Sequence, residues 1–264
     1  MTFALTPDII ITAIISGAII GVFLGTFGGG GSVLAAPLLL YVVRVRDPHV
    51  AIGTSAAAVA AIALFSLIGH WRGGNVKWPC AIVFALSGFA GSIIGSSIAK
   101  QVDGTQLLLA FSAAMAVIAL SMFRKPAFAG DPDVHLTRSI MLRLAPLGLL
   151  VGMAAGFFGI GGGFLIVPGL MLAAGMTMTN ATASSLVSVA LFGAATSANY
   201  ALSGLVDGRL VLLLLLGGAV GGLVGIGISR LLKSRVRTAR SAFAVMILVV
   251  AAYVAWNAWG AMTV

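Results

Sequence analysis

The sequence predicts an all-α, polytopic integral membrane protein built from two homologous halves, and three observations support this fold class. Of the 264 residues, 60% are hydrophobic and only 8% are charged, which is too few charges to cover a water-soluble protein of this size. Apolar runs of about 18 residues or more, the length that spans the hydrocarbon of a bilayer, recur along the chain. One long block of sequence also occurs twice. Lipid is therefore the expected partner of most of the outer surface.

The duplicated block begins with a glycine-rich run in each half. The stretch from Gly21 to Pro37 matches the stretch from Gly152 to Pro168 at a constant offset of 131 positions. After a slip of one residue the match continues at an offset of 130, which pairs Ser55 with Ser185. We therefore predict a first membrane repeat at residues 1–123, a cytoplasmic linker at 124–143 and a second membrane repeat at 144–264.

Each half contains five apolar segments in the same order. The first half has them at residues 9–27, 32–43, 49–69, 79–100 and 105–123, and the second at 144–158, 164–175, 181–202, 209–230 and 241–260. The second segment of each half is about 12 residues long, or about 18 Å as a helix, so it cannot cross a hydrocarbon core of about 30 Å. We therefore predict that segments one and two form a glycine-broken re-entrant hairpin, followed by about three spanning helices.

The distribution of Lys and Arg predicts how the halves are oriented. If each hairpin returns to its own side, each half crosses the membrane an odd number of times, and the two halves form an inverted repeat. Of the 15 basic residues, four then lie on one side, Arg44, Arg46, Lys100 and Arg209, and the remaining eleven lie on the linker side. The positive-inside rule makes the linker side cytoplasmic. We expect a multi-pass protein of a bacterial inner (plasma) membrane with both termini on the periplasmic or extracellular side.

The two glycine runs are candidate binding sites for an anion. They comprise Gly28, Gly29, Gly30, Gly31 and Ser32 in the first half, and Gly159, Gly161, Gly162 and Gly163 in the second. Each run precedes a short helix that we expect to begin near Ser32 or Phe164, and a helix start presents unpaired N–H groups and the positive end of the helix dipole. The alternative is that these glycines only permit close helix packing.

Hydroxyl side chains recur at the start of the third segment of each half. They are Thr54 and Ser55 in the first half and Ser184 and Ser185 in the second, where Asn180 is the expected helix N-cap. Hydroxyl donors at this position could complete the hydrogen-bonding shell of an oxyanion. The alternative is that each hydroxyl bonds a carbonyl of its own helix, as is common in membrane helices.

His70 and Arg72 are candidate gate or proton-linked residues at the end of the third segment. The alternative is an aromatic and basic belt at the membrane interface without further function.

All six carboxylates are aspartates, and each lies outside or at the edge of an apolar segment, which favours an anion over a cation as the ligand. No metal site, cofactor motif or catalytic motif is visible, so we expect neither a metal nor a cofactor nor an enzyme.

Paired motifs carry a resemblance to a known family. GTFGGGGSVLAAPLL and GFFGIGGGFLIVPGLML are each followed by a hydroxyl motif, AIGTS or ATASS, and HWRGGNVKW follows the first copy. At these residues the chain resembles the TauE/SafE family, also called the TSUP group of sulfite exporters. The resemblance implies a transporter, usually an exporter, of sulfur-containing anions such as sulfite, sulfoacetate and other organosulfonates. It implies a site at residues 28–32, 54, 55, 159–163, 184 and 185.

From these observations we expect a secondary transporter that works by alternating access. The two glycine breaks would converge on a site near the middle of the membrane, and one half would rock against the other. The rival hypotheses are an anion channel with the same site and a membrane-embedded enzyme or assembly subunit without transport. The expected partners are a small anion and the lipid bilayer; nucleic acid is not expected, and a homo-oligomer is left open.

Overall fold

The chain folds into a bundle of membrane-length helices. The computed structural model describes residues 6–123, 130–159, 163–231 and 236–262. Within this part, eight helical stretches are long and apolar enough to cross a membrane, which confirms the all-α membrane fold class. The elements are α1 (Pro7–Phe27), η1 (Gly28–Leu34), α2 (Ala35–Pro37), η2 (Leu38–Val42), α3 (Pro48–Arg72), α4 (Trp78–Ala99), α5 (Gly104–Met122), α6 (Arg138–Phe158), α7 (Gly163–Ala174), α8 (Met178–Ala201), α9 (Gly208–Leu231) and α10 (Val236–Met262).

The first two segments of each half form a hairpin. Gly28 ends α1 with a φ of 62°, a value that favours glycine, and the chain then reverses. A side chain at Gly31 would overlap the backbone of Phe23 and Leu24, so the returning segment of the hairpin lies directly against α1. In the second half, Gly159 ends α6 with a φ of 66°, and α7 returns in contact with α6. We call these segments hairpin 1 (residues 7–42) and hairpin 2 (residues 138–174).

Hairpin 1 differs from the expectation at its return. The sequence predicts a helix beginning near Ser32, but the glycines themselves form a 3₁₀ helix from Gly28 to Leu34. One α-helical turn and a π-helical turn then complete the return. Four glycines have no side chains to crowd the tight 3₁₀ turns, and the Ser32 hydroxyl donates to Gly29 O at 2.8 Å. The glycine run is therefore part of the returning helix.

Two glycine seams join helices from different halves. In the first seam α1 packs on α9, and in the second α4 packs on α6, so closely that an added Cβ would overlap the backbone of the facing helix. The seam glycines are Gly17, Gly21 and Gly25 of α1, Gly217, Gly221 and Gly225 of α9, Gly91 and Gly95 of α4, and Gly148, Gly152 and Gly156 of α6. Small residues allow this approach in membrane helices. The halves are therefore interlocked, because segment one of each half packs on segment four of the other.

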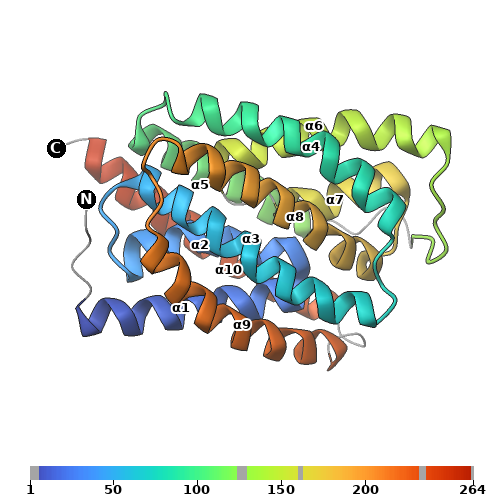
Figure 1. Cartoon of the computed structure of the whole chain (residues 1–264), viewed down its shortest axis with the longest axis horizontal. Helices are drawn as coiled ribbons and strands as arrows, with labels where there is room; N and C mark the ends of the chain where they lie inside the picture. The colour runs from blue at the N-terminus through green and yellow to red at the C-terminus, as the bar shows by residue number, and fades with distance from the viewer. Residues whose placement is uncertain (1–5, 124–129, 160–162, 232–235, 263–264) are drawn as a thin grey trace.

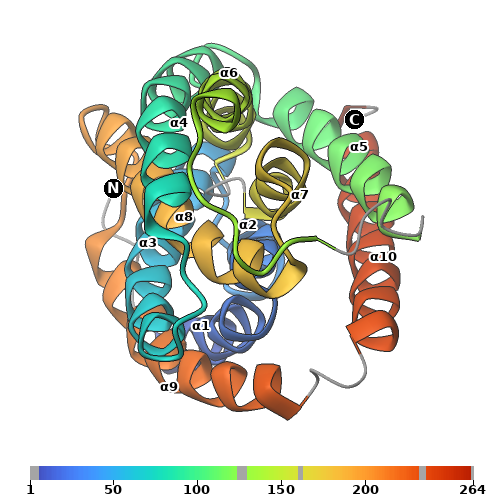
Figure 2. The ribbon, with the colours of Figure 1, turned by 90° about the vertical axis from the view of Figure 1, so that its right-hand side faces the viewer.

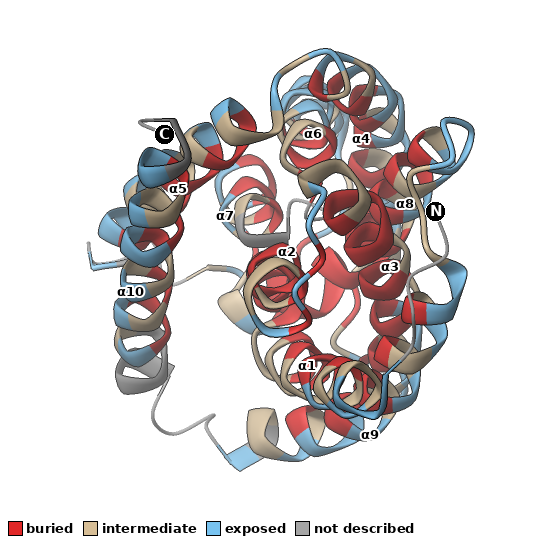
Figure 3. Cartoon of the chain, turned by 90° about the vertical axis from the view of Figure 1, so that its left-hand side faces the viewer, coloured by how far each residue is buried: buried red, intermediate tan, exposed pale blue. Residues whose placement is uncertain are grey.

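The remaining long helices also pair with helices of the other half. α3 packs on α8, and α5 packs on α10, so segments three and five each meet their counterpart from the other half. The returning elements α2 and α7 lie between the α3–α8 pair and the α5–α10 pair (Figure 2). Phe27 stacks on Phe243 of α10 with ring centroids 4.4 Å apart, and Phe158 contacts Phe111 of α5 at 6.0 Å. Buried residues concentrate in this interior, and the outer faces are exposed (Figure 3).

Both ends of the chain lie at one end of the bundle, and the link between the halves lies at the other (Figure 1). We call these the terminal end and the linker end.

Three aspartates cap helices that begin at the terminal end: Asp47 on α3, Asp103 on α5 and Asp207 on α9. The N–H groups of Thr105 and Gln106 hold the pKa of the Asp103 carboxyl below its usual range. The symmetry of the repeat, the domain limits and the side of the membrane that each end faces stay predictions.

Candidate functional site

The turn of hairpin 1 rests on α8 of the other half. The Gly29 N–H donates to Ser185 Oγ at 3.0 Å, and this hydroxyl donates in turn to Thr182 O at 2.7 Å. A side chain at Gly28 would overlap Thr182, so glycine is required both for the positive φ and for the close approach. Ser185 is fully buried. The structure thus brings the predicted residues Gly28, Gly29 and Ser185 together.

His70 lies beside the same turn. Its Nε2 is 3.0 Å from the carbonyl oxygen of Gly25, in the last turn of α1. Because a carbonyl only accepts, this ring nitrogen donates. His70 is 7% exposed although it lies near the end of α3. Arg72, the last residue of α3, is exposed. We call Gly28, Gly29, Thr182, Ser185 and His70 the tip-1 site.

The turn of hairpin 2 rests on α3 in the equivalent way. A side chain at Gly159 would overlap Ile52, the counterpart of Thr182 at the offset of 130. Ser55, the counterpart of Ser185, donates to Ile52 O at 3.0 Å. Gly161 and Gly162 lie outside the described residues, and Gly163 begins α7.

The two groups of predicted residues lie toward opposite ends of the bundle. α3 and α8 run antiparallel, with Gly53 beside Tyr200 and Ala60 beside Gly193. Ser55 is therefore level with the end of α8, whereas Ser185 is level with the end of α3. At 1.5 Å per residue the two serines are separated by about 20 Å along the helices. The structure brings Ser185 to the hairpin 1 turn and Ser55 to Ile52, which faces Gly159, and it does not bring the two serines together.

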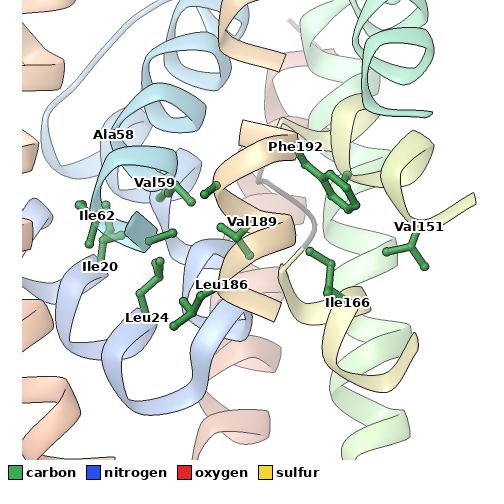
Figure 4. Packing of buried hydrophobic residues seen from close by; sticks show 14 of the residues in the cluster. Ile20, Leu24, Ala58, Val59, Ile62, Val151, Ile166, Leu186, Val189 and Phe192 are labelled. Carbon is green, nitrogen blue, oxygen red and sulfur yellow. The ribbon is translucent and has the colours of Figure 1, made fainter. Parts of the chain in front are cut away.

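Apolar side chains fill the space between the two turns. Val59 of α3 and Val189 of α8, which correspond at the offset of 130, are both fully buried. Around them pack Ile20, Leu24, Ile62, Leu186, Phe192, Val151 and Ile166 (Figure 4). A charged solute in this region would lose its hydration, because the polar side chains on these stretches of α3 and α8 are single hydroxyls such as Ser66, Ser188 and Thr196. We call Val59, Val189 and their neighbours the apolar barrier.

Comparison with known proteins agrees with this architecture. The family model described as sulfite exporter TauE/SafE matches residues 13–254. The chain belongs to the TauE/SafE family. A "Probable membrane transporter protein" of Xylella fastidiosa (strain 9a5c) is 44% identical over 98% of this chain and 99% of its own length. "Probable membrane transporter protein YunE" of Bacillus subtilis (strain 168) is 27% identical over 82% of this chain and 89% of its own. No solved structure matches the chain significantly.

Two hydroxyls of the predicted TauE/SafE site bind the backbone at helix starts. Thr54 Oγ1 accepts from the N–H of Asp207 at 3.0 Å, at the start of α9. Ser184 Oγ accepts from the N–H of Lys77 at 2.9 Å, at the start of α4. Each hydroxyl thereby satisfies a backbone donor at the beginning of the other half's fourth segment. Both are fully buried, and neither contacts a hairpin turn through these bonds.

Asn180 is not the N-cap of α8, contrary to the sequence-based expectation. Thr177 has that role, because its Oγ1 accepts from the N–H of Asn180 at 3.3 Å. Asn180 is already helical, and its Nδ2 donates to Pro132 O in the linker at 3.0 Å. Thr177 precedes the helix by one residue in an extended conformation, which is the N-cap geometry. Asn180 therefore fastens the linker of this TauE/SafE chain to α8.

The other predicted glycines of the TauE/SafE motif surround the turn. Gly30 faces Phe243 of α10, and an added Cβ would lie 3.3 Å from its ring. Gly31 faces α1, as described above. Sequence reasoning missed Thr182, which contributes a carbonyl, and Tyr200, a fully buried residue beside Gly53. The repeat contained the signal for Tyr200, because the offset of 130 pairs it with His70.

Proposed function

We propose that this protein is a secondary transporter, acting as an exporter, of small sulfur-containing anions such as sulfite, sulfoacetate or other organosulfonates. Membership of the TauE/SafE family and the names of the relatives support a membrane transporter. The description of the family as sulfite exporters supports the choice of anion. The cell membrane we expect is a bacterial inner membrane.

The observation that carries the proposal is the hydrogen bond between Gly29 N–H and Ser185 Oγ. A backbone N–H in a glycine turn is a good anion donor, because a ligand can approach the backbone closely there. In this conformation the serine oxygen accepts that hydrogen bond. An oxyanion would take its place as the acceptor, and the Ser185 hydroxyl would then turn to donate to the anion. His70, whose Nε2 donates to Gly25 O, lies beside the same turn.

The positions of the carboxylates favour the same class of ligand. All six aspartates lie at helix starts or in the linker, and the linker residue Asp133 is 3.9 Å from Lys77 at the start of α4. A cation carrier would need oxygen ligands with negative charge in the spans, and a neutral donor set suits an anion better. Sulfite and sulfonates present several acceptor oxygens to such donors. Nothing in the tip-1 site would form a covalent bond to them.

The glycine seams support a particular pair of moving bodies. One body would comprise α1, its hairpin return, α3 and α9, and the other would comprise α6, α7, α8 and α4. Each body contains segments from both halves, so the bodies differ from the two sequence halves. They meet at α3 and α8 and where the hairpins touch. Sliding or tilting at this interface would open the apolar barrier toward one end and then the other.

Uptake into proteoliposomes tests the proposal. Vesicles that contain the purified protein are expected to take up radiolabelled sulfite or sulfoacetate faster than protein-free vesicles, and unlabelled sulfonates are expected to compete. Replacing sodium with choline in the buffer controls for any effect of the cation on the measured uptake. Uptake of none of these anions above the protein-free rate would overturn the proposal.

A further inference from the structure

Tyr200 carries a buried hydroxyl that lacks a hydrogen-bond partner in the described part of the chain. The residue is 0% exposed, and among the described residues its Oη makes no hydrogen bond. An unsatisfied buried hydroxyl destabilises a fold unless a ligand or water completes it. Tyr200 lies at the end of α8, next to Ile52, which supports the hairpin 2 turn. A hydroxyl is therefore available near the terminal end of the bundle.

The repeat assigns Tyr200 the position that His70 has at the other end. Both residues end the third segment of their half, and the offset of 130 pairs them, as it pairs Ser55 with Ser185 and Ile52 with Thr182. His70 lies at the tip-1 site. Tyr200 thus stands where a donor to a ligand at the second hairpin turn would be expected.

His49 provides a second unsatisfied polar atom beside Tyr200. The two rings are stacked with centroids 6.3 Å apart, and His49 Nδ1 is buried without a hydrogen-bond partner among the described residues. The rest of the His49 side chain is partly exposed at the start of α3. The phenol and imidazole rings therefore lie side by side, and part of the His49 side chain is exposed at the terminal end.

The charges around this pair are compatible with an anion. Asp47 and Asp103 are the nearby carboxylates, and each is engaged as a helix cap that accepts from two backbone N–H groups. The positive ends of the α3 and α5 dipoles offset these charges. Arg44 and Arg46 precede α3 at the same end. The phenol of Tyr200 donates a hydrogen bond at any physiological pH.

We infer that Tyr200 and His49 form a second binding point for a small oxyanion, separate from the tip-1 site and on the far side of the apolar barrier. The ligand is a second molecule of the transported anion, held by the Tyr200 O–H and a His49 ring N–H, and this inference rests on the proposed function. The anion would pass from Ser185 to Tyr200 when the barrier opens. The wild-type protein then binds two anions per chain.

Titration calorimetry with sulfite tests this inference. The wild-type protein is expected to bind two sulfite ions per chain, and Tyr200→Phe is expected to weaken one of the two by at least fivefold. His49→Gln is expected to weaken the same site. Tyr253→Phe, at an exposed position of α10, is the matched control and leaves both sites unchanged. Without sulfite, Tyr200→Phe is expected to have an unfolding temperature equal to or above that of the wild type, because the lost hydroxyl has no partner.

Three results would contradict the inference, and they separate it from the proposed function. Binding of one sulfite, lost in Ser185→Ala and unaffected by Tyr200→Phe, would remove the second site and leave the proposed function intact. A lower unfolding temperature of ligand-free Tyr200→Phe, with two sites retained, would show a structural role for the hydroxyl. Absence of any sulfite binding by the wild type would overturn the tip-1 site as well.

Discussion

At the scale of single residues, similar hydroxyls have different roles that depend on which atom each contacts. Ser185 bonds the hairpin 1 turn, whereas Ser184, one residue earlier, bonds the start of α4. Thr54 does the same at the start of α9. The difference follows from helix geometry, because neighbouring residues point about 100° apart around the axis. Adjacent hydroxyls can therefore be assigned to binding and to stability separately.

Ser185→Ala tests the binding role. We expect anion affinity to fall by about 0.5–1.5 kcal/mol, because one hydrogen bond to the ligand is lost. Ser112→Ala on α5 is the matched control, since this serine is also buried and donates to a carbonyl of its own helix, Leu109 O, at 2.8 Å. Titration calorimetry measures both variants. Equal affinity of Ser185→Ala and wild type would remove Ser185 from the site.

Thr54→Val tests the structural role. The substitution keeps the shape of the side chain but leaves the Asp207 N–H without its acceptor. We expect a loss of about 1 kcal/mol in the free energy of unfolding and no change in anion affinity. Thermal unfolding in detergent, followed by a binding titration of the folded variant, measures the two quantities. A fall in affinity with unchanged stability would place Thr54 in the binding site instead.

At the scale of helices, the glycines have two distinct tasks. Those at the hairpin turns allow positive φ values, and those along the seams allow backbones to touch. Seam glycines repeat at about one per helical turn, which keeps them on one face. The helices so joined belong to different halves, and the fold depends on both halves being present.

Gly91→Ala tests the seam. An added Cβ would overlap the backbone of Leu149 on α6, and a backbone cannot move aside as a flexible side chain can. We expect a marked fall in unfolding temperature or failure to fold. Gly227→Ala on α9 is the control, because no atom lies within 4 Å of the added Cβ, and alanine favours a helix by about 0.5–1 kcal/mol over glycine. Tolerance of both substitutions would mean that the seam is looser than described.

Most of the helices could be predicted from the sequence, but their partners could not. Apolar length located the eight longer segments, because the hydrocarbon thickness fixes the length of a span, and the glycine runs located the two short ones. A glycine indicates close approach without naming the facing helix, so the contact of Gly21 with Gly218 required the structure. Asn180 was misplaced because Thr177 lies three residues earlier and caps better in its extended conformation. His49 and Tyr200 were missed because their adjacency joins different halves.

At the scale of the whole molecule, the interlocked halves change which parts can move. The α1–α9 and α4–α6 pairs each join the two halves. A simple rocking of the first half against the second would therefore separate both packed pairs. Movement at the α3–α8 interface leaves the seams intact and changes the surroundings of the apolar barrier. Small sliding of packed helices is a common form of such transitions.

Cysteine cross-links test which bodies move. In a Cys80→Ser background, a disulfide between Ala60→Cys and Gly193→Cys joins α3 to α8, where an added Cβ on Gly193 lies 3.0 Å from the Ala60 Cβ. That Cβ also lies 2.8 Å from Ala56 O, so transport by the reduced double variant is the control for the substitution itself. We expect the disulfide to stop transport reversibly, with recovery on reduction. Ser96→Cys with Asn199→Cys joins α4 to α8 within one body, where the side chains are hydrogen-bonded at 2.7 Å, and transport is expected to continue. The opposite pattern would refute the proposed bodies.

Counterflow tests the central claim, that the protein is a carrier with an anion site that opens to each side in turn. Proteoliposomes are loaded with unlabelled sulfite, and the entry of a trace of labelled sulfite is followed at zero membrane potential. In vesicles with wild-type protein, labelled sulfite is expected to accumulate transiently above its outside concentration, and in vesicles with Ser185→Ala it is expected to do so more slowly. Entry that only equilibrates the label, at a rate that does not depend on the sulfite inside, would identify a channel and contradict alternating access.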